Sequence, residues 1–240
     1  MPITRLLIGT IVFCAAGCSS AALKDRFRFE DIRFEQRLEV VKGAPVVVFG
    51  RVLEVQNVGS PSSSGADRRV KTQLIQVKAS VEVPIKGNIS KDEMQFYYFA
   101  FSSESSIGPR IRPYYPETGQ ERVFFLEPWE NTFRSVGDVA DYTLRVRSGG
   151  HPKDFCSGKT PESCIADMLL IPREGADPAE FAAYLPESAY VTSILCSPEA
   201  ARTLLERLTS NTIPVISENA KSTLSMQGEK GAVPWSDARD

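Results

Sequence analysis

Residues 45–55, PVVVFGRVLEV, decide the fold. β-Branched and aromatic residues fill the first half of this stretch, and apolar and polar residues alternate from Arg51 to Val55. The first feature is typical of a buried strand and the second of a strand with one solvated face. We therefore expect a strand here, and a sheet domain around it.

Further stretches on its C-terminal side have the same character. Segments rich in Gly, Pro and Ser separate them, and no helical period occurs between the first three. The expected strands span residues 45–55, 70–85, 94–101, 122–126 and 143–147. Strands of these lengths in such an order predict a small antiparallel barrel or sandwich over residues 45–150.

The pattern becomes helical beyond residue 150. Apolar residues at helical spacing stop at Pro172, and Asp177 and Ser197 each precede a Pro, as a cap residue does at the start of a helix. Pro214 opens a last helix, which we expect to form an antiparallel hairpin with the one before it. The sequence thus predicts a helical subdomain over residues 151–226 and a flexible tail over 227–240.

The strand block resembles the netrin-like, or tissue-inhibitor-of-metalloproteinase-like, branch of the OB-fold. The resemblance lies in the opening strand, in a long second strand ending at Lys86-Gly87, and in a strand entered from Gly119. It implies an α+β chain: a five-stranded antiparallel OB-like β-barrel followed by a small C-terminal helical subdomain. Inhibitors of that group bind the zinc of a protease through an N-terminal Cys-x-Cys pair. Cys18 has no Cys two residues on, so we carry over the fold and not the inhibition.

Residues 1–17 are interpreted as a lipoprotein signal peptide. Arg5 supplies the positive charge, and the apolar run from Leu6 to Phe13 is too short to cross a bilayer. The run Ala15-Ala16-Gly17-Cys18 resembles the bacterial lipobox, although Ala15 stands where Leu is usual. The resemblance implies that Cys18 becomes the lipidated N-terminus.

Lipidation at Cys18 would place the protein on the extracytoplasmic side of a bacterial cell membrane or outer membrane, because several acyl chains anchor stably. The alternative is an ordinary secretory signal cleaved near Ala22. Residues 18–44 would form a tether. We expect a short helix from Phe29 to Val41, although the alternation around Arg26 to Phe29 also fits a strand.

Cysteine usage agrees with export. Of the five Cys, Cys14 lies in the signal segment and Cys18 is the expected anchor, which leaves Cys156, Cys164 and Cys196. Disulfides persist outside the cytoplasm, so we expect Cys156 and Cys164 to form a bridge. A bridge that uses Cys196, or free thiols, are the alternatives.

The sequence contains a single His, His151. It could act as a general base near Asp154, or bind zinc together with Cys156, Cys164 and Cys196. We expect instead a solvated loop histidine, because the ligand spacing fits no compact zinc site and no nucleophile or phosphate-binding motif occurs. No catalytic residue, metal or cofactor is therefore assigned.

Two aromatic stretches are candidates for binding. The strand at residues 96–101, FYYFAF, could form a stacking platform or fill the barrel. The loop after it carries planar cations beside flat rings, a composition common at binding surfaces: Arg110, Arg112, Tyr114 and Tyr115. A rigid Pro-rich connection is the alternative. The net charge of −2 argues against nucleic acid as a partner.

These observations predict a lipid-anchored cell-envelope protein that acts as a non-enzymatic binding or scaffolding module for an unknown protein or glycan. A hydrolase or metal-dependent enzyme centred on His151 is the alternative. A purely structural subunit is a third possibility that the sequence does not separate from the first.

Overall fold

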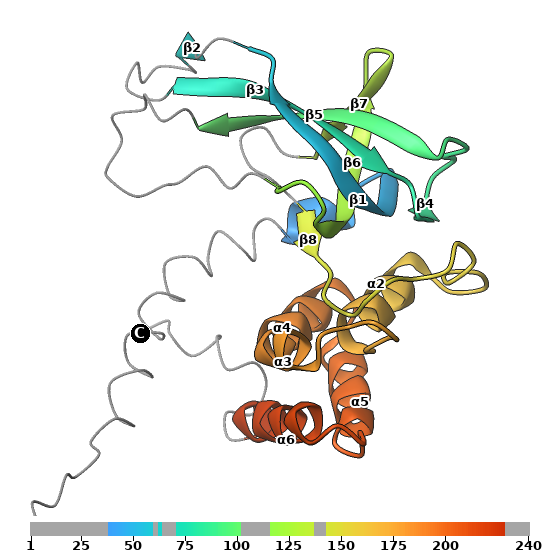
Figure 1. Cartoon of the computed structure of the whole chain (residues 1–240), viewed down its shortest axis with the longest axis vertical. Helices are drawn as coiled ribbons and strands as arrows, with labels where there is room; N and C mark the ends of the chain where they lie inside the picture. Colours follow the sequence, from blue (N-terminus) through green and yellow to red (C-terminus); the bar gives the residue numbers. More distant parts are fainter. Residues whose placement is uncertain (1–37, 60–61, 64–70, 102–115, 137–142, 229–240) are drawn as a thin grey trace, which may run out of the picture. The chain divides into compact units, whose positions relative to one another are not determined.

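The structure, a computed structural model, describes residues 38–59, 62–63, 71–101, 116–136 and 143–228 (Figure 1). Its strands are β1 (Val46–Asn57), β2 (Ser62–Ser63), β3 (Lys71–Ser80), β4 (Val83–Lys86), β5 (Glu93–Phe101), β6 (Glu121–Trp129), β7 (Thr132–Ser135) and β8 (Thr143–Arg145). Its helices are α2 (Pro161–Leu170), α3 (Pro178–Ala183), α4 (Leu185–Leu195), α5 (Pro198–Leu208) and α6 (Pro214–Gly228). The barrel and the helices belong to one compact unit, so the α+β prediction is confirmed.

Five strands close into a barrel in the order β1-β3-β5-β7-β6, because β3 and β6 both pair with β1. The prediction that all of its strands are antiparallel is wrong: β5 and β7 pair in parallel. The reason is geometric. A closed ring with an odd number of strands cannot alternate direction throughout, so at least one neighbouring pair must be parallel.

The strand predicted over residues 143–147 is present as β8, but it is not the fifth strand of the ring. Residues 132–135 complete the ring as β7, whereas β8 pairs only with β6, beside β7. β7 follows β6 through a tight hairpin in which Trp129 pairs with Thr132. Glu130 in that turn has a φ of 53°, a left-handed conformation that most side chains disfavour. The sequence lacks the Asn-Gly or Gly-rich signal that normally predicts such a turn.

The long strand predicted over residues 70–85 is two strands. β3 ends at Ser80 and β4 begins at Val83, yet both pair with β1. Glu82 donates its backbone N–H to the carbonyl of Phe49, which keeps the interruption attached to β1. β2 forms a short extension of the sheet beside β3, inside a segment predicted to be a loop.

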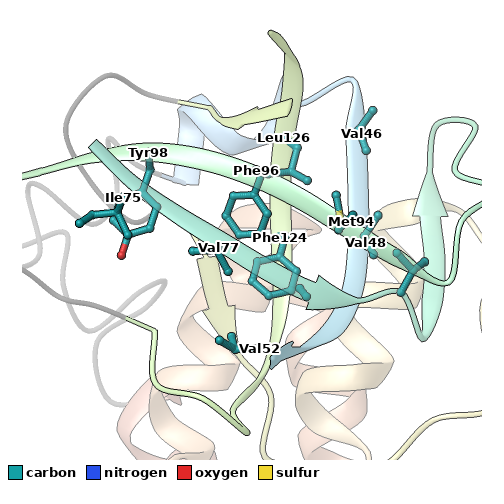
Figure 2. Packing of buried hydrophobic residues seen from close by; sticks show 12 residues of the cluster. Val46, Val48, Val52, Ile75, Val77, Met94, Phe96, Tyr98, Phe124 and Leu126 are labelled. Carbon is teal, nitrogen blue, oxygen red and sulfur yellow. The ribbon is translucent and has the colours of Figure 1, made fainter. Parts of the chain in front are cut away.

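The barrel interior is filled by alternating residues of the ring strands. Figure 2 shows rings and aliphatic chains from opposite strands meeting there, with Phe96 and Phe124 at 5.0 Å between ring centroids. The buried cluster comprises Val46, Val48, Val52, Ile75, Val77, Ala79, Val81, Met94, Phe96, Tyr98, Phe124 and Leu126. The prediction that one face of the aromatic strand fills the barrel is therefore confirmed for Phe96 and Tyr98.

β1 and β6 are buried on both faces. Val47, Phe49, Val123 and Phe125 alternate with the interior residues, so they point outward, yet each is at most 3 % exposed. The ring of Phe49 lies 5.2 Å from that of His151, which belongs to the segment leading into the helices. Burial on both faces explains why these strands read as unbroken apolar runs rather than as alternation.

The helix starts predicted from Asp177, Ser197 and Pro214 are confirmed. Asp177 accepts hydrogen bonds from the N–H groups of Ala179 and Glu180, as a helix cap does. α4 was not expected from the sequence; its Pro186 lies in the first turn of the helix, where a proline is tolerated.

The first and last described residues bear on the predicted N-terminal helix and on the predicted C-terminal tail. Residues 38–42 are helical, in agreement with the end of the helix expected from Phe29 to Val41, the rest of which lies outside the described residues. α6 runs to Gly228, and the rest of the tail predicted from residue 227 lies outside the described residues.

Candidate functional site

The most distinctive surface in the described residues is the outside of β3, β5 and the β6–β7 hairpin. Strand alternation directs polar and aromatic side chains to this side. We use the name outer barrel face for six of them: Gln76, Lys78, Gln95, Tyr97, Trp129 and Arg134. The register places Gln76 opposite Tyr97 and Lys78 opposite Gln95. Tyr97 also pairs with Arg134 of β7. Because residues directly opposite each other share a face, these side chains lie together.

Two aromatic rings form the centre of this face. The Tyr97 and Trp129 rings lie 5.3 Å apart in an edge-to-face arrangement of 70°, a favourable geometry for aromatic pairs. Both residues are partly exposed. Gln95 donates its side-chain amide N–H to the Tyr97 hydroxyl at 2.6 Å. Thr132 donates its hydroxyl to the backbone carbonyl of Gln95 at 2.7 Å. The rings are thus held in place and remain accessible.

The charges on this face are paired. The Lys78 ammonium lies 2.6 Å from the Glu93 carboxylate, and the Arg134 guanidinium lies 2.6 Å from the Glu127 carboxylate. A hydrogen bond and charge attraction from Glu93 raise the pKa of Lys78. Glu54 of β1 also lies directly opposite Lys78 and adds a further negative charge beside it. Each cation of this face therefore has at least one carboxylate next to it.

The structure does not describe the binding residues predicted from the sequence. Arg110, Arg112, Tyr114 and Tyr115, as well as the lipidation residue Cys18, lie outside the described residues. Sequence reasoning considered Tyr97 but missed Trp129. The position of Trp129 on the same face follows only from β7, the strand that the sequence did not reveal.

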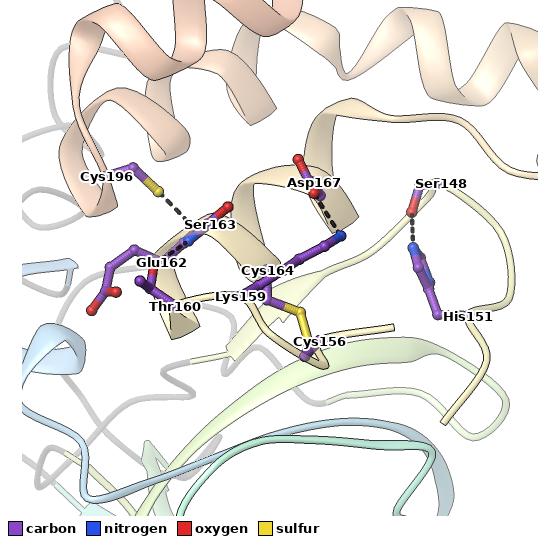
Figure 3. Close-up of a disulfide and its surroundings, with 10 residues drawn as sticks. All are labelled: Ser148, His151, Cys156, Lys159, Thr160, Glu162, Ser163, Cys164, Asp167 and Cys196. Carbon is purple, nitrogen blue, oxygen red and sulfur yellow. Dashed lines mark hydrogen bonds and ion pairs between the residues drawn. A yellow bond between two sulfur atoms is a disulfide. The ribbon is translucent and has the colours of Figure 1, made fainter. Parts of the chain in front are cut away.

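Cys156 and Cys164 form a disulfide, with Cα atoms 5.3 Å apart, so this prediction is confirmed (Figure 3). The bridge fastens the loop before α2 to the buried side of that helix, where Cys164 is fully covered. The same loop is held by an ion pair of 2.7 Å between Lys159 and Asp167, and by Thr160, whose hydroxyl caps α2.

Cys196 is the free thiol of the described residues. Its Sγ donates to the Glu162 carbonyl at 3.0 Å, beside a groove of about 580 Å³ between α2 and α5 (Figure 3). Burial, with the nearby Glu162 charge, raises the pKa of this thiol to about 11. Because the thiolate is the nucleophile, this raised pKa keeps Cys196 mostly in the less reactive thiol form at neutral pH.

His151 is buried, so the expectation of a solvated loop histidine is wrong. The residue is 8 % exposed and its ring lies 4.5 Å from that of Phe155 and 5.2 Å from that of Phe49. Nε2 lies 3.4 Å from the Ser148 hydroxyl (Figure 3). Burial, reinforced by the positive charges of Arg173 and Lys159, lowers the pKa of His151 to about 4. The imidazole is neutral at pH 7.

The structure does not bring together the Cys₃His set considered for zinc. Two of its sulfurs are joined in the disulfide, and thiolates rather than disulfide sulfurs bind zinc. Among the residues that the structure describes, no group of three or more His, Cys, Asp or Glu side chains is placed to hold a metal ion.

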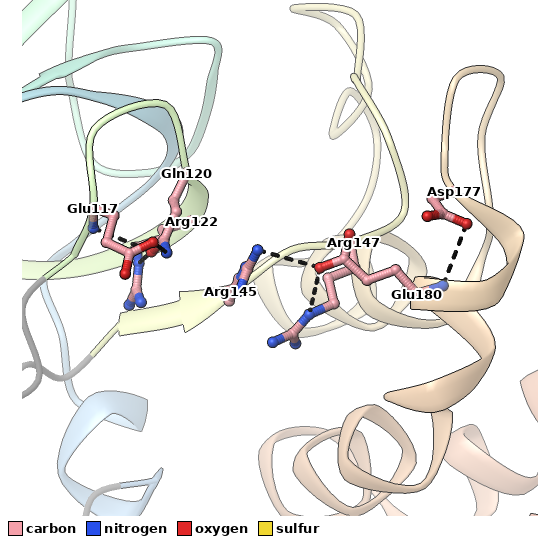
Figure 4. Close-up of polar contacts among 7 residues, drawn as sticks. All are labelled: Glu117, Gln120, Arg122, Arg145, Arg147, Asp177 and Glu180. Atoms are coloured by element: carbon pink, nitrogen blue, oxygen red, sulfur yellow. Dashed lines mark hydrogen bonds and ion pairs between the residues drawn. The ribbon is translucent and has the colours of Figure 1, made fainter.

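A polar network joins the barrel to the helices (Figure 4). The Glu180 carboxylate of α3 lies 3.2 Å from the guanidinium of Arg145 and 3.3 Å from that of Arg147. Arg145 is the last residue of β8, and Arg147 follows that strand. The Arg147 guanidinium also lies 3.1 Å from the centroid of the Tyr184 ring. These contacts fasten α3 to the last barrel-associated strand, and we assign them a structural role.

Buried Arg122 occupies one end of the barrel. It is 1 % exposed, donates to the Gln120 side chain at 3.1 Å and also bonds the Thr143 hydroxyl. Gln120 in turn donates to the Glu117 carboxylate at 2.8 Å (Figure 4). Because a buried charge is tolerated only with partners, this chain of contacts holds the loop before β6 and β8 together.

Removing the disulfide is expected to lower the free energy of unfolding by about 2–3 kcal/mol, since the bridge closes a short loop in the unfolded chain. The test is urea denaturation of the double variant Cys156→Ala/Cys164→Ala. Cys196→Ala is the matched control, because it removes a sulfur outside the bridge. A double variant as stable as this control would contradict a stabilising role.

No helix in the part of the chain that the structure describes is both long and apolar enough to cross a bilayer. No protein-family model matches the sequence, and no curated protein matches it significantly.

Proposed function

We propose that this chain is a lipid-anchored protein of the bacterial cell envelope that acts as a non-enzymatic binding module. The observation that carries the proposal is the run Ala15-Ala16-Gly17-Cys18 directly after a short apolar segment. The disulfide supports it, because such bridges persist in the oxidising compartments outside the cytoplasm.

The outer barrel face supports the binding part of the proposal. We propose that the barrel is of the OB class, a five-stranded Greek-key architecture that binds ligands on its second and third strands and in neighbouring loops. β3 and β5 are the second and third strands of the ring counted from β1, and the β6–β7 hairpin lies beside them. Tyr97 and Trp129 are therefore at the position where such a barrel presents its ligand surface.

A scaffolding role is compatible with the same features. The catalytic alternative centred on His151 has less support. Its neutral ring packs against Phe49 and Phe155, and the Ser148 hydroxyl beside Nε2 is fully buried, so neither group is open to a substrate. We therefore assign no reaction to the protein.

The anchor is tested by expressing the full chain in a bacterial host and measuring its mass and membrane partition. The wild type is expected to carry the mass of a diacylglyceryl group plus an acyl chain, and to sediment with membranes. Cys18→Ala is expected to lose both properties. Cys14→Ala is the matched control, because Cys14 lies in the segment that is removed, and it is expected to behave as the wild type.

Cleavage near Ala22, with a soluble, unlipidated product from all three forms, would refute the anchor. The protein would then be a freely secreted one.

A further inference from the structure

We propose that the outer barrel face binds an uncharged glycan chain. The inference rests on the proposed binding function and names its ligand class. Its starting point is the Tyr97–Trp129 pair, two partly exposed rings at the centre of a sheet face. Flat rings stack on the apolar C–H face of a sugar, and their edge-to-face arrangement leaves a ring face available for that contact.

The charge balance selects among ligand classes. A surface for nucleic acid or another polyanion needs cations that are free to neutralise the ligand. Here Lys78 is paired with Glu93, and Arg134 is paired with Glu127. A polyanion would have to displace these carboxylates and would be repelled by them. An uncharged ligand neither displaces these carboxylates nor is repelled by them, which favours a neutral polar chain.

The groups around the rings match the hydroxyls of such a chain. A glutamine amide offers four hydrogen-bonding positions, and the contact of Gln95 with the Tyr97 hydroxyl occupies one of them. Gln76 adds a second amide directly across from Tyr97. Amides serve as both donor and acceptor, as sugar hydroxyls do. An apolar protein partner would cover these amides without bonding them and would leave them unsatisfied.

Weak binding is sufficient for this role. Stacking of a flat ring contributes modestly per contact, so we expect a dissociation constant on the order of 1 mM for a short oligosaccharide. An anchored protein beside a repeating glycan meets many equivalent sites at high local concentration. Effective concentrations in the millimolar range make such an affinity functional.

The test uses Trp129 as its own reporter. The chain has two Trp, and the other, Trp235, lies outside the described residues, so the full chain carrying Trp235→Phe emits from Trp129 alone. The probe is the hexasaccharide of N-acetylglucosamine, added to protein in a zwitterionic detergent, because sugar-headed detergents would compete. We expect a saturable change in fluorescence that persists at high salt.

Variants separate the rings from the fold. Tyr97→Ala is expected to weaken binding at least about tenfold, whereas Tyr97→Phe, which keeps the ring, retains most of it. Trp129→Leu is followed by calorimetric titration and is expected to lose binding while its thermal unfolding stays cooperative. Val215→Ala, an exposed apolar truncation on α6, is the control and should bind as the wild type does.

Absence of saturation, or salt-sensitive binding of a single-stranded oligonucleotide in place of the sugar, would overturn the glycan assignment. A second arm keeps the two proposals apart. If the sugar fails but crosslinking in intact envelopes captures a protein that Trp129→Leu no longer captures, the ligand is a protein and the binding function stands. If neither arm depends on Trp129, the outer barrel face is not a binding surface.

Discussion

Substitution of Gly50 by Ala is expected to lower the free energy of unfolding by about 3 kcal/mol or more, because a backbone atom blocks the new methyl group. A Cβ at residue 50 would lie 1.8 Å from the carbonyl oxygen of Ser80 and 3.6 Å from the Phe124 ring. Side chains can rotate away from an intruding methyl group, but this carbonyl cannot. Ser80 is held against β1, since its hydroxyl accepts the backbone N–H of Arg51 at 3.0 Å.

The measurement is thermal unfolding. For a chain of this size, a loss of about 3 kcal/mol corresponds to a fall in Tm of roughly 6–12 °C. Gly150→Ala is the matched control: a Cβ there meets no atom within 4 Å, and its φ is not in the left-handed range. Equal effects of the two variants would show that Ala is tolerated at residue 50 and that the two strands are not in close contact there.

Gly50 also illustrates how far the sequence could predict the barrel. The strand at residues 45–55 was evident from its composition, but the reason for its glycine depends on Ser80, the last residue of another strand. The interruption between β3 and β4 allows this close approach, and it lies within a stretch that alternates without a visible break. Contacts between residues far apart in the sequence determine where a glycine is required and where a strand is interrupted. Local sequence patterns do not reveal these contacts.

The hairpin at Glu130 limited the prediction of the candidate site in the same way. Sequence patterns identified the aromatic strand and indicated that one of its two faces fills the barrel, but they did not show that this face is the one with Phe96 and Tyr98. The partner ring, Trp129, was missed because β7 was missed. A left-handed glutamate without a neighbouring glycine gives no turn signal, so pairing with β5 and β6 must impose this conformation.

The helical subdomain was easier to predict because its signals are local. Cap residues and first-turn prolines sit within four residues of the hydrogen bonds they affect. The burial of His151 was not local, because the rings that cover it come from β1 and from the loop before α2.

Lowering the pH from 6.5 to 4 is expected to remove about 3 kcal/mol of stability through His151 alone. The pKa of this residue is about 4 in the folded protein and 6.5 in an exposed histidine. Between these values the unfolded chain binds a proton that the folded chain does not, so acid favours unfolding. The contribution is complete above pH 6.5 and is lost as the pH falls to 4.

The pKa of His151 is low because its ring is buried at the junction between the barrel and the helices. Protonation would place a charge between the Phe49 and Phe155 rings, with Arg173 and Lys159 nearby and both positive. The Arg173 guanidinium and the Lys159 ammonium already lie over the Phe155 ring, at 4.3 and 3.9 Å from its centroid. An added imidazolium would be repelled by both and separated from water.

Urea denaturation of the wild type and of His151→Gln at several pH values measures this effect. Carboxylates titrate in the same range, but they are common to both proteins and cancel in the difference. The difference in stability should shrink by about 3 kcal/mol as the pH falls from 6.5 to 4. Because the chain has a single histidine, its imidazole signal can also be followed directly by NMR. An imidazole that titrates near pH 6.5 in the folded protein, with parallel stability curves, would mean that the ring is solvated and that the junction does not depend on its neutrality.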